Sequence, residues 1–314
     1  MKIDTEQAVR LIEEHQEFII LTHCNPDGDT LGCGYALMRA LKKQGKKVKT
    51  VNADTIGSDF SYLIRPNDEV SENAFVIAVD TADIKLLGSV KEEYEGRIQL
   101  CIDHHGSNRL FAKHTLLDST AAAACEIMYD VIKKMGVTVD EDIATCLYTG
   151  ISTDTGCFRY SNVTSRTHFI AGELIALGAD HGEVDRVMFE TKSKEYFALE
   201  RLCLEKMKIL FDGKVAMICI NRKMFLESGA DESCTDAIKA IPRQVKGAVI
   251  GVTLREKDDG TFKISVRTHA PYDASEICRQ FGGGGHERAA GCEIAENEEK
   301  SIELFTEAIK KYLN

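Results

Sequence analysis

The stretch FIILTHCNPDGDT, residues 18–30, decides how the N-terminal part of the chain folds. Its first six residues form a continuous apolar run that ends in polar residues, and the loop NPDGD follows. A helical pattern then extends from about Thr30 to Gln44. Continuous apolar runs are typical of strands that are covered on both faces, as in a parallel sheet. The stretch therefore predicts a buried strand, a polar loop at its carboxyl end and a helix.

Three later apolar runs also end in polar residues and are predicted to be strands: KVKTVNA (47–53), AFVIAVDT (74–81) and IQLCIDHH (98–105). Helical patterns follow at about 120–135, 140–152, 164–178 and 193–211. Strands that alternate with helices predict an α/β fold with a doubly wound, mostly parallel sheet.

The organisation changes after about Val215. In GAVIGVTLREKDDGTFKISVRTHA (247–270), two β-rich runs flank the turn-forming DDG, which indicates a hairpin. A short helix (273–281), a glycine run and a C-terminal helix (297–313) follow, so we expect a smaller α+β domain with an antiparallel sheet. The expected division is a first domain over 1–190, a helical linker over 191–211 and a second domain over 212–314. The active site is expected in the cleft between the two domains.

Composition excludes several classes of protein. The net charge of -11 argues against a binder of long duplex nucleic acid, which usually carries a basic surface. No apolar run approaches the roughly 18–20 residues of a membrane span, and the N-terminus lacks the layout of a secretory signal. We therefore expect a cytoplasmic protein without a membrane partner. The 11 cysteines form no C-x-x-C pair, which favours reduced, buried thiols over a disulfide framework.

Side chains of the types that bind metals follow four of the predicted segments. They are His23, Asp27, Asp29, Asp80, Asp103, His104, His105 and Asp154. Ligands bind at the carboxyl ends of the strands in an open parallel sheet, so these groups should converge at one edge. A single Asp after a strand, such as Asp29, is usually a helix cap, and a lone His at a strand end is more often a core residue than a ligand. The convergence of four segments favours a metal site.

The spacing within the segments predicts how the ligands are shared. Asp27 and Asp29 are two residues apart in a loop, so their carboxylates can reach different metal ions, and Gly28 between them permits an unusual backbone angle. His104 and His105 are adjacent in an extended segment, so we expect them to point to opposite sides and only one to bind a metal.

Asp80 is the candidate for a bridging ligand. A shared carboxylate brings two metals to roughly 3.5–4 Å from each other, the separation in two-metal hydrolases. Histidine and carboxylate ligands without thiolates favour manganese or magnesium-like ions. A phosphate substrate would need further cationic groups.

The C-terminal part offers those groups. FGGGGHERAAG (281–291) contains a glycine run, Gly283, Gly284 and Gly285 among it, followed by His286. Glycine-rich loops let backbone N–H groups approach a phosphate, although a flexible turn is the alternative interpretation. Arg267 and Arg159 are further candidates for phosphate binding because the guanidinium fork matches phosphate oxygens. A surface ion pair is the alternative for Arg267.

These segments resemble the motifs of the DHH phosphoesterase superfamily over nearly the whole chain. The matching segments are THCNPDGDTLG (22–32), VDTAD (79–83), IDHHGSN (102–108) and STDTGCFRY (152–160). FGGGGHERAAG resembles the signature of the DHH-associated C-terminal domain, in the version shared with RecJ-like nucleases.

The resemblance implies a division of ligands between two metal ions. One ion is bound by His23, Asp27 and Asp80, and the other by Asp29, Asp80, His104 and Asp154. The resemblance also implies that Asp103 supports the metal ligands and that His105 lies near the scissile phosphate. Asp80, Asp103 and His105 are the implied catalytic residues. Manganese is the implied ion.

A two-domain chain of this length most resembles the bacterial branch of bifunctional oligoribonucleases and pAp phosphatases (NrnA-type). That implies hydrolysis of short RNA to mononucleotides and removal of the 3′-phosphate of adenosine 3′,5′-bisphosphate (pAp) by a water that two metals activate. The alternatives are a phosphodiesterase for pApA or cyclic di-AMP, a RecJ-like single-strand exonuclease, and a nucleotide-binding module without catalysis. A homodimer stays open.

Overall fold

The computed structural model describes residues 1–313, apart from the side chain of residue 236; residue 314, the last of the predicted second domain, lies outside them. The chain forms two compact units, Met1–Thr191 and Lys192–Asn314. Each has its own sheet and its own apolar cores.

The first unit is built on a six-stranded parallel sheet of order β1-β6-β5-β4-β2-β3. Its strands are β1 (Lys2–Ile3), β2 (Glu17–Leu21), β3 (Lys47–Val51), β4 (Phe75–Val79), β5 (Ile98–Asp103) and β6 (His114–Leu117). The predicted α/β class and parallel sheet are confirmed. The short strands β1, at one edge of the sheet, and β6, beside it, carried no recognised pattern in the sequence.

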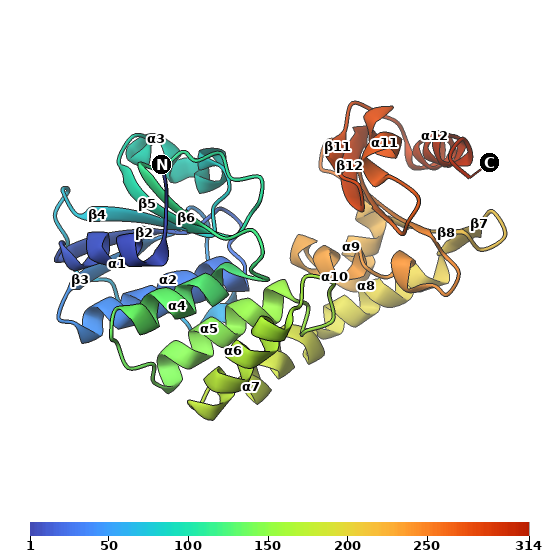
Figure 1. Ribbon diagram of the computed structural model, residues 1–314. Coiled ribbons are helices and arrows are strands. Elements are labelled where there is room, and N and C mark those ends of the chain that lie inside the picture. The colour runs from blue at the N-terminus through green and yellow to red at the C-terminus, as the bar shows by residue number, and fades with distance from the viewer. Residues whose placement is uncertain (314) are drawn as a thin grey trace. The chain divides into compact units, whose positions relative to one another are not determined.

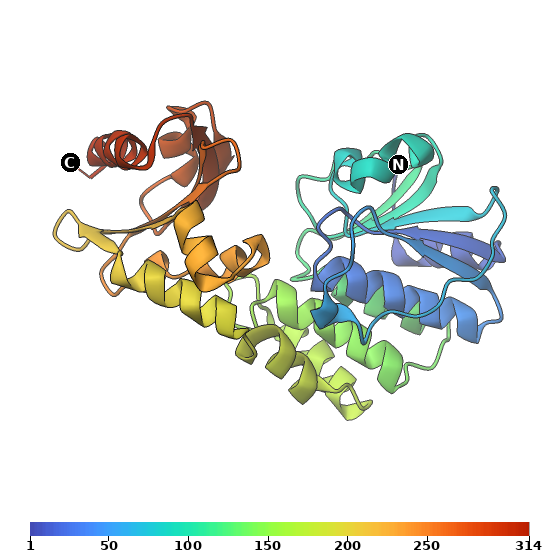
Figure 2. The same cartoon turned by 180° about the vertical axis from the view of Figure 1, so that it is seen from behind.

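Helices and short turns cover both faces of this sheet. The longer helices are α1 (Thr5–Glu13), α2 (Gly28–Lys43), α4 (Ala124–Lys134), α5 (Glu141–Asp154) and α6 (Ser165–Ala176). The shorter ones are η1 (Ser58–Phe60), η2 (Ile84–Val90), α3 (Lys91–Tyr94), α7 (His181–Asp185) and η3 (Arg186–Glu190). Figures 1 and 2 show α2 and α4 along one face and α3 on the other.

Strand β2 shows why its apolar run is continuous. Phe18 and Ile20 belong to the core beneath α2 and α4, whereas Ile19 and Leu21 belong to the core beneath η2 and α3. Successive side chains of a strand point to opposite faces, so a strand between two cores needs apolar residues at every position.

The second unit contains a six-stranded sheet of order β11-β12-β10-β9-β8-β7. The strands are β7 (Lys208–Leu210), β8 (Val215–Ile220), β9 (Ile250–Glu256), β10 (Phe262–Thr268), β11 (Gly284–His286) and β12 (Ala289–Ile294). The predicted hairpin across DDG is confirmed as the antiparallel pair β9–β10. The prediction of an antiparallel sheet was wrong in one respect: β8 and β9 are parallel, because the segment between them returns the chain to the starting end of the sheet.

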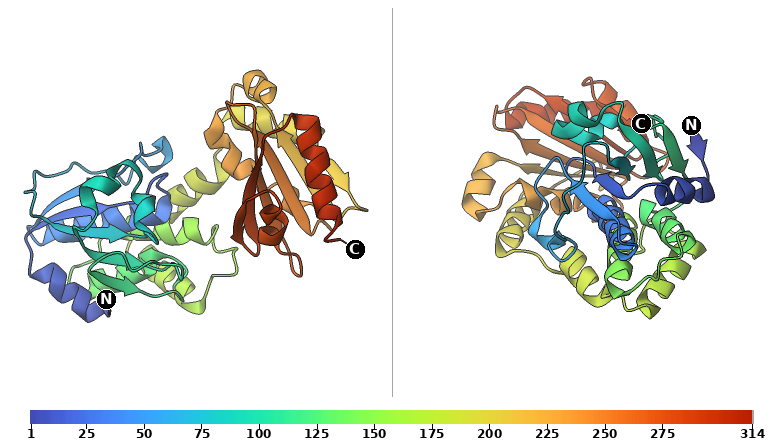
Figure 3. Two further views of the ribbon diagram at one scale, coloured as in Figure 1. Left: turned by 90° about the horizontal axis from the view of Figure 1, so that it is seen from above. Right: turned by 90° about the vertical axis from the view of Figure 1, so that its left-hand side faces the viewer.

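Helices also pack on both sides of this second sheet. They are α8 (Lys194–Glu205), α9 (Arg222–Ser228), η4 (Glu232–Cys234), α10 (Thr235–Ile238), η5 (Pro242–Gln244), α11 (Ala274–Arg279) and α12 (Glu298–Lys310). One core lies under α11 and α12, and the other joins α8, α9 and α10 to β8. The left panel of Figure 3 shows α12, in red, along its face of the sheet. The helix expected over 193–211 ends at Glu205, because Lys208–Leu210 pairs with β8 as β7.

Candidate metal centre

Strands β2, β4 and β5 of the first sheet end beside one another, and each ends in a predicted site residue or shortly before one. Asp80 directly follows β4, Asp103 is the last residue of β5, and His23 follows β2 by two residues. Strands β2 and β5 both pair with β4, so their carboxyl ends are adjacent. The parallel register therefore brings together side chains that are up to 80 positions apart in the sequence, from His23 to Asp103.

A first group consists of His23, Asp27 and Asp80, whose candidate ligand atoms lie within 4.8 Å of one another. His23 Nε2 lies 3.6 Å from Asp27 Oδ1 and 3.6 Å from Asp80 Oδ2. The Asp27 carboxylate also caps α2, because its Oδ1 accepts hydrogen bonds from the N–H groups of Asp29 and Thr30. The cap considered for Asp29 is therefore formed by Asp27.

A second group consists of Asp29, His104 and Asp154, also within 4.8 Å of one another. His104 Nε2 lies 3.9 Å from Asp29 Oδ2 and 3.6 Å from Asp154 Oδ2. It also lies 3.5 Å from Asp80 Oδ1. Asp80 thus faces the first group with one carboxylate oxygen and the second group with the other.

Asp80 is a buried carboxylate whose negative charge is only partly compensated by hydrogen bonds. Its residue is 2% exposed, and Oδ1 has no hydrogen-bond partner among the described residues. Burying a carboxylate oxygen without a partner is costly unless a cation compensates it. Its backbone also has a φ of 51°, a left-handed conformation that is uncommon outside glycine and is typical of functional sites.

The distances between the ligand atoms suit a shared metal ion. Values of 3.5 to 3.9 Å are too long for good hydrogen bonds between the histidines and carboxylates. Two ligands that each lie about 2.1 Å from one ion are about 3–3.5 Å apart at angles of roughly 90–110°. Together with the unpartnered oxygen of Asp80, the donor set fits two divalent cations.

Electrostatics within the cluster point the same way. Burial lowers the pKa of His23, but the carboxylates of Asp27 and Asp80 outweigh burial and raise it to about 11. Burial, reinforced by the charges of Asp80 and Asp27, raises the pKa of Asp154 to about 6. Burial and its acidic neighbours also hold the pKa of Asp29 well above its ordinary value. Crowded carboxylates that raise one another's pKa are the ones that bound cations would stabilise.

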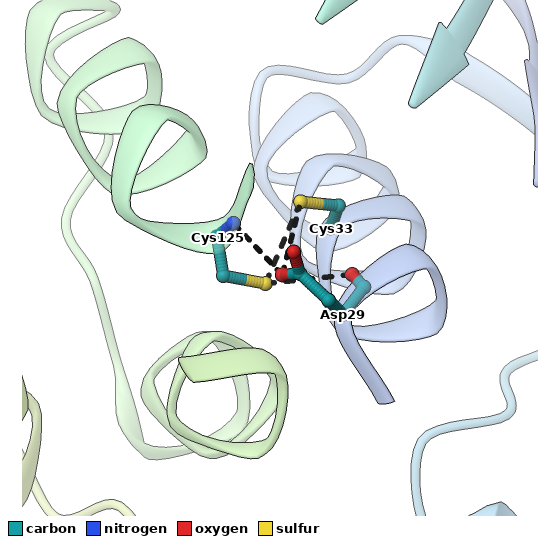
Figure 4. A group of neighbouring side chains, drawn as sticks. All are labelled: Asp29, Cys33 and Cys125. Carbon is teal, nitrogen blue, oxygen red and sulfur yellow. Dashed lines mark hydrogen bonds between the residues drawn. The ribbon is translucent and has the colours of Figure 1, made fainter. Parts of the chain in front are cut away.

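Asp29 is held rigidly from behind. Its Oδ2 accepts a hydrogen bond of 2.6 Å from the N–H of Ala124 and its Oδ1 one of 2.9 Å from that of Cys125, both in the first turn of α4. Figure 4 shows Asp29 beside the thiols of Cys33 and Cys125, whose sulfur atoms lie 3.5 Å apart. Burial raises the pKa of Cys33 to about 12 and raises that of Cys125 as well, so both are protonated packing groups. None of the sequence motifs indicated their contact with Asp29.

The two adjacent histidines do not point to opposite sides, and that expectation was wrong. Their ring centroids are 4.5 Å apart, and His105 Nδ1 lies 3.5 Å from Asp80 Oδ1. Strand β5 ends at Asp103, so the alternation of an extended strand no longer applies to the residues that follow. His104 and His105 therefore face the same cluster.

Asp103 positions His105 and the backbone around it. Its Oδ1 lies 2.8 Å from His105 Nδ1 and accepts hydrogen bonds from the N–H groups of His104 and His105. Its Oδ2 accepts a 2.5 Å hydrogen bond from Asn108 Nδ2. Despite burial, these partners lower the pKa of Asp103, and Asp103 in turn raises the pKa of His105 to about 9. Asn108 stands within the segment IDHHGSN but was not recognised as part of the site.

Gly28 serves packing and not an unusual backbone angle, contrary to expectation. Its φ is not positive, but a Cβ atom added there would lie 2.3 Å from Thr153 Oγ1 on α5. The glycine lets α2 approach α5, which ends at Asp154. The contact places the first turn of α2, which contains Asp29, against the last turn of α5, which contains Asp154.

The remaining candidate of the first unit is Arg159. Its Nε donates a 2.6 Å hydrogen bond to the carbonyl of Gly156, and its guanidinium lies 5.7 Å from the ring centroid of Phe189. The side chain is exposed and follows Asp154 by five residues. A pocket of about 550 Å³ lined by Arg39 and Tyr62, among others, contains none of the predicted site residues.

In the second unit, strand register aligns Arg267 with His286. Arg267 pairs with Ala289 of β12, and Ala289 pairs with His286 of the edge strand β11. Directly opposed residues share one face of a sheet, so the two candidate side chains flank the small side chain of Ala289. Gly284 and Gly285 belong to β11, and Gly283 immediately precedes it. The glycine run is thus partly an edge strand and not only a loop.

None of the helices within residues 1–313 has both the length and the apolar composition of a membrane-crossing helix.

Comparisons with known proteins match both units of the chain. Residues 17–151 match the model of the DHH family, N-terminal domain, and residues 223–314 match that of the DHHA1 domain. A bifunctional oligoribonuclease and PAP phosphatase of Thermus thermophilus is 33% identical over 303 residues, 94% of this chain and 89% of that protein. A protein of the same description from Bacillus subtilis is 26% identical and covers 92% of each chain.

Among solved structures, an exopolyphosphatase-related protein of Bacteroides fragilis superimposes with a TM-score of 0.88 at 23% identity, covering 98% of this chain and 96% of that one. This likeness shows the shared fold.

Proposed function

We propose that this chain, which belongs to the DHH family of phosphoesterases, hydrolyses short oligoribonucleotides to mononucleotides and removes the 3′-phosphate of pAp. The family and its relatives make the chain a hydrolase of phosphate esters. The finer activity is supported by the relative from Thermus thermophilus, which carries both activities in its description and matches 94% of the chain.

The observation that carries the proposal is the position of Asp80 between two ligand groups. His23 and Asp27 would hold one divalent ion, and Asp29, His104 and Asp154 the other, with Asp80 contributing one oxygen to each. When bound, the two ions would supply Lewis-acid activation of water and charge neutralisation at phosphorus. Hard oxygen and imidazole ligands favour manganese as the ion.

The protein's own groups would orient the substrate and handle its protons. His105 is partly exposed beside Asp80, and Asp103 fixes its ring through Nδ1, so Nε2 is left to face a phosphate oxygen or a proton in transit. Arg159 is the candidate of the first unit for binding a substrate phosphate. In the second unit, Arg267, His286 and the glycine segment would hold the nucleotide.

A manganese-supplemented assay on pAp, pApA, cyclic di-AMP and RNA of two to five residues tests the proposal. The wild type should release phosphate from pAp and mononucleotides from the RNA. Asp80→Asn should lower both rates by at least about a hundred-fold, because even residues that only support metal ligands cost 10–100-fold. Asparagine tolerates the left-handed backbone of residue 80, so the variant removes the charge without the strain of another residue.

Each outcome of this assay has a distinct meaning. Full activity of Asp80→Asn would refute the shared ligand. Turnover of pApA or cyclic di-AMP alone would select the phosphodiesterase alternative, and nucleotide binding without turnover would indicate a binding module. Lys246→Ala, which removes an exposed charge of the second unit, should act like the wild type.

A further inference from the structure

The segment that follows α5 turns the chain back onto the end of that helix. Three consecutive residues, Gly156, Cys157 and Phe158, have φ values of 57°, 57° and 60°. Left-handed conformations are uncommon outside glycine, so a run of three is unfavourable unless other contacts hold it. The Phe158 ring stacks on His168 with the ring centroids 5.4 Å apart, and the Phe158 N–H donates to Thr155 Oγ1 at 3.1 Å. These contacts fix the turn within the first unit.

The turn also provides hydrogen-bond donors for the end of α5. An α-helix leaves its last four carbonyl groups without partners inside the helix. In α5, three of them accept from N–H groups that follow the helix: Ile151 from Thr155, Ser152 from Cys157, and Thr153 from Gly156. The fourth carbonyl belongs to Asp154, the last residue of α5 and a predicted metal ligand. It accepts a 3.2 Å hydrogen bond from Nδ2 of Asn162, which the turn brings back to the helix end.

The same amide nitrogen holds a second segment of the site. Asn162 Nδ2 also donates to the carbonyl of Ala122, at 3.0 Å. Carbonyl oxygens only accept hydrogen bonds, so the nitrogen of this amide, and not its oxygen, must face both partners. The preceding carbonyl, that of Ala121, lies 3.2 Å from His104 Nδ1. Because this carbonyl requires a proton on Nδ1, Nε2 of His104 is left free to bind a metal ion.

We propose that Asn162 is a positioning residue for the second ligand group, because it joins the backbone of Asp154 to the segment that orients His104. The inference rests on the proposed function, since it assigns a residue outside the ligand set to one of the two metal ions. Within residues 1–313, both side-chain hydrogen bonds of Asn162 go to the supports of this second group. Its loss should therefore weaken one ion and spare the ion at His23 and Asp27.

The expected size of the effect follows from what Asn162 does and from its exposure. Residues that orient metal ligands usually contribute 10–100-fold to metal affinity. Asn162 is exposed, so water can replace part of the two hydrogen bonds that a variant loses. We therefore expect a loss near the lower end of that range, about ten-fold.

A manganese titration of the full chain without substrate measures this effect, with the electron paramagnetic resonance of free manganese as the signal. The wild type should bind two ions. Asn162→Ala should weaken one site by about ten-fold and leave the other unchanged. Asn162→Leu keeps the approximate shape of the side chain but has no donor, so it should behave like Asn162→Ala. Ser161→Ala, at the adjacent exposed residue, is the matched control and should bind both ions like the wild type.

Two variant backgrounds identify the site that is affected. His23→Ala removes a ligand of the first group, and adding Asn162→Ala to it should weaken the ion that remains. His104→Ala removes a ligand of the second group, and adding Asn162→Ala to it should change nothing. Equal weakening in both backgrounds would show a general structural role and overturn the inference. No weakening in either background would overturn it as well.

Activity gives an independent readout, because a site that is only weakened can be filled again. At low manganese, Asn162→Ala should hydrolyse pAp more slowly than the wild type, and about ten-fold more manganese should restore its kcat. A loss that excess manganese does not restore would contradict the inference. If the wild type binds two ions but hydrolyses none of the substrates, the proposed function fails, while the manganese titration still decides the role of Asn162.

Discussion

At the scale of single residues, the metal centre depends on groups that position the ligands as well as on the ligands themselves. Asp80 is buried, strained and lacks a partner for one oxygen, which is unfavourable for folding alone. Asp103 is hydrogen-bonded at both carboxylate oxygens, to His105 and to Asn108, and these bonds fix the ring of His105 beside Asp80. The strained backbone thus belongs to Asp80, which would bind metal, whereas the supporting residues Asp103 and Asn108 are fully hydrogen-bonded.

Asn108 provides a test of this support. Asn108→Ala removes the donor to Asp103 Oδ2, so we expect kcat to fall by about 10–100-fold, the usual cost for residues that orient metal ligands. KM should change little, because Asn108 faces Asp103 and not the substrate. The measurement is steady-state kinetics on pAp with manganese. Ser107→Ala, in the same exposed loop, is the control, and equal losses in both variants would contradict the role of Asn108.

Glu126, on α4, should make stability depend on pH. Glu126 is only 1% exposed, and burial raises the pKa of its carboxyl group above the ordinary 4.5. An acid whose folded pKa is raised binds its proton more tightly when folded, so stability falls as the pH rises from the unfolded pKa through the folded one. Glu126→Gln removes this loss. Urea denaturation should therefore show a stabilisation by Glu126→Gln that is larger at pH 8 than at pH 5; a difference that is independent of pH would contradict the prediction.

At the scale of elements, the cluster is assembled by the contact of helices with one another and with the strand ends. Helix α2 carries Asp27 as its cap and Asp29 in its first turn, α4 holds Asp29 through two N–H groups, and α5 ends at Asp154. Small shifts between α2 and α5 would therefore separate ligands of one group.

Gly28→Ala tests this helix contact. The new methyl group would collide with Thr153, so we expect the variant to lose about 1–3 kcal/mol of stability, a typical cost of overpacking, and to lose activity. Adding Thr153→Ala removes two of the three closest atoms, so the double variant should be more stable than the sum of the single changes. Thermal unfolding measures both effects. Strict additivity would show that residues 28 and 153 do not touch.

At the scale of the whole molecule, an excess of negative charge is concentrated where cations are expected. The chain has a net charge of -11, and four aspartates gather at one sheet edge: Asp29 and Asp80 are buried, Asp154 is half-buried and Asp27 is exposed. Each unit has its own core, and the metal centre lies in the first unit, so we expect metal binding to stabilise that unit. Arg267 and His286 lie in the other unit, and their use together with the metal centre stays a prediction.

Metal binding should therefore stabilise the protein in a way that depends on Asp80. Manganese at about 100 times its dissociation constant adds about 2.7 kcal/mol to the free energy of unfolding. The melting temperature of the wild type should rise with manganese and return with chelator. Asp80→Asn should melt higher than the wild type in chelator, because a buried carboxylate is gone, and should gain less from manganese. An equal manganese response in both proteins would exclude Asp80 as a ligand.

Much of the fold could be predicted from the sequence because its signals are local. The continuous apolar runs gave the central strands, since a strand covered on both faces needs apolar residues throughout. DDG located the β9–β10 hairpin. The short strands β1 and β6 were missed because runs of 2 and 4 residues are too short to show a pattern. The parallel pairing of β8 with β9 was missed because it depends on a distant partner.

The sequence by itself determined which side chains could bind metal, because residue type and position at a strand end suffice for that expectation. Only the tertiary structure decided how those side chains are arranged. His104 and His105 face one cluster because β5 ends before them, and Gly28 is needed for the approach of Thr153 from α5. Arg243 can lie beside the partner of Arg267 because that partner is Gly251, which has no side chain. Such contacts arise between residues far apart in the chain, and no local pattern encodes them.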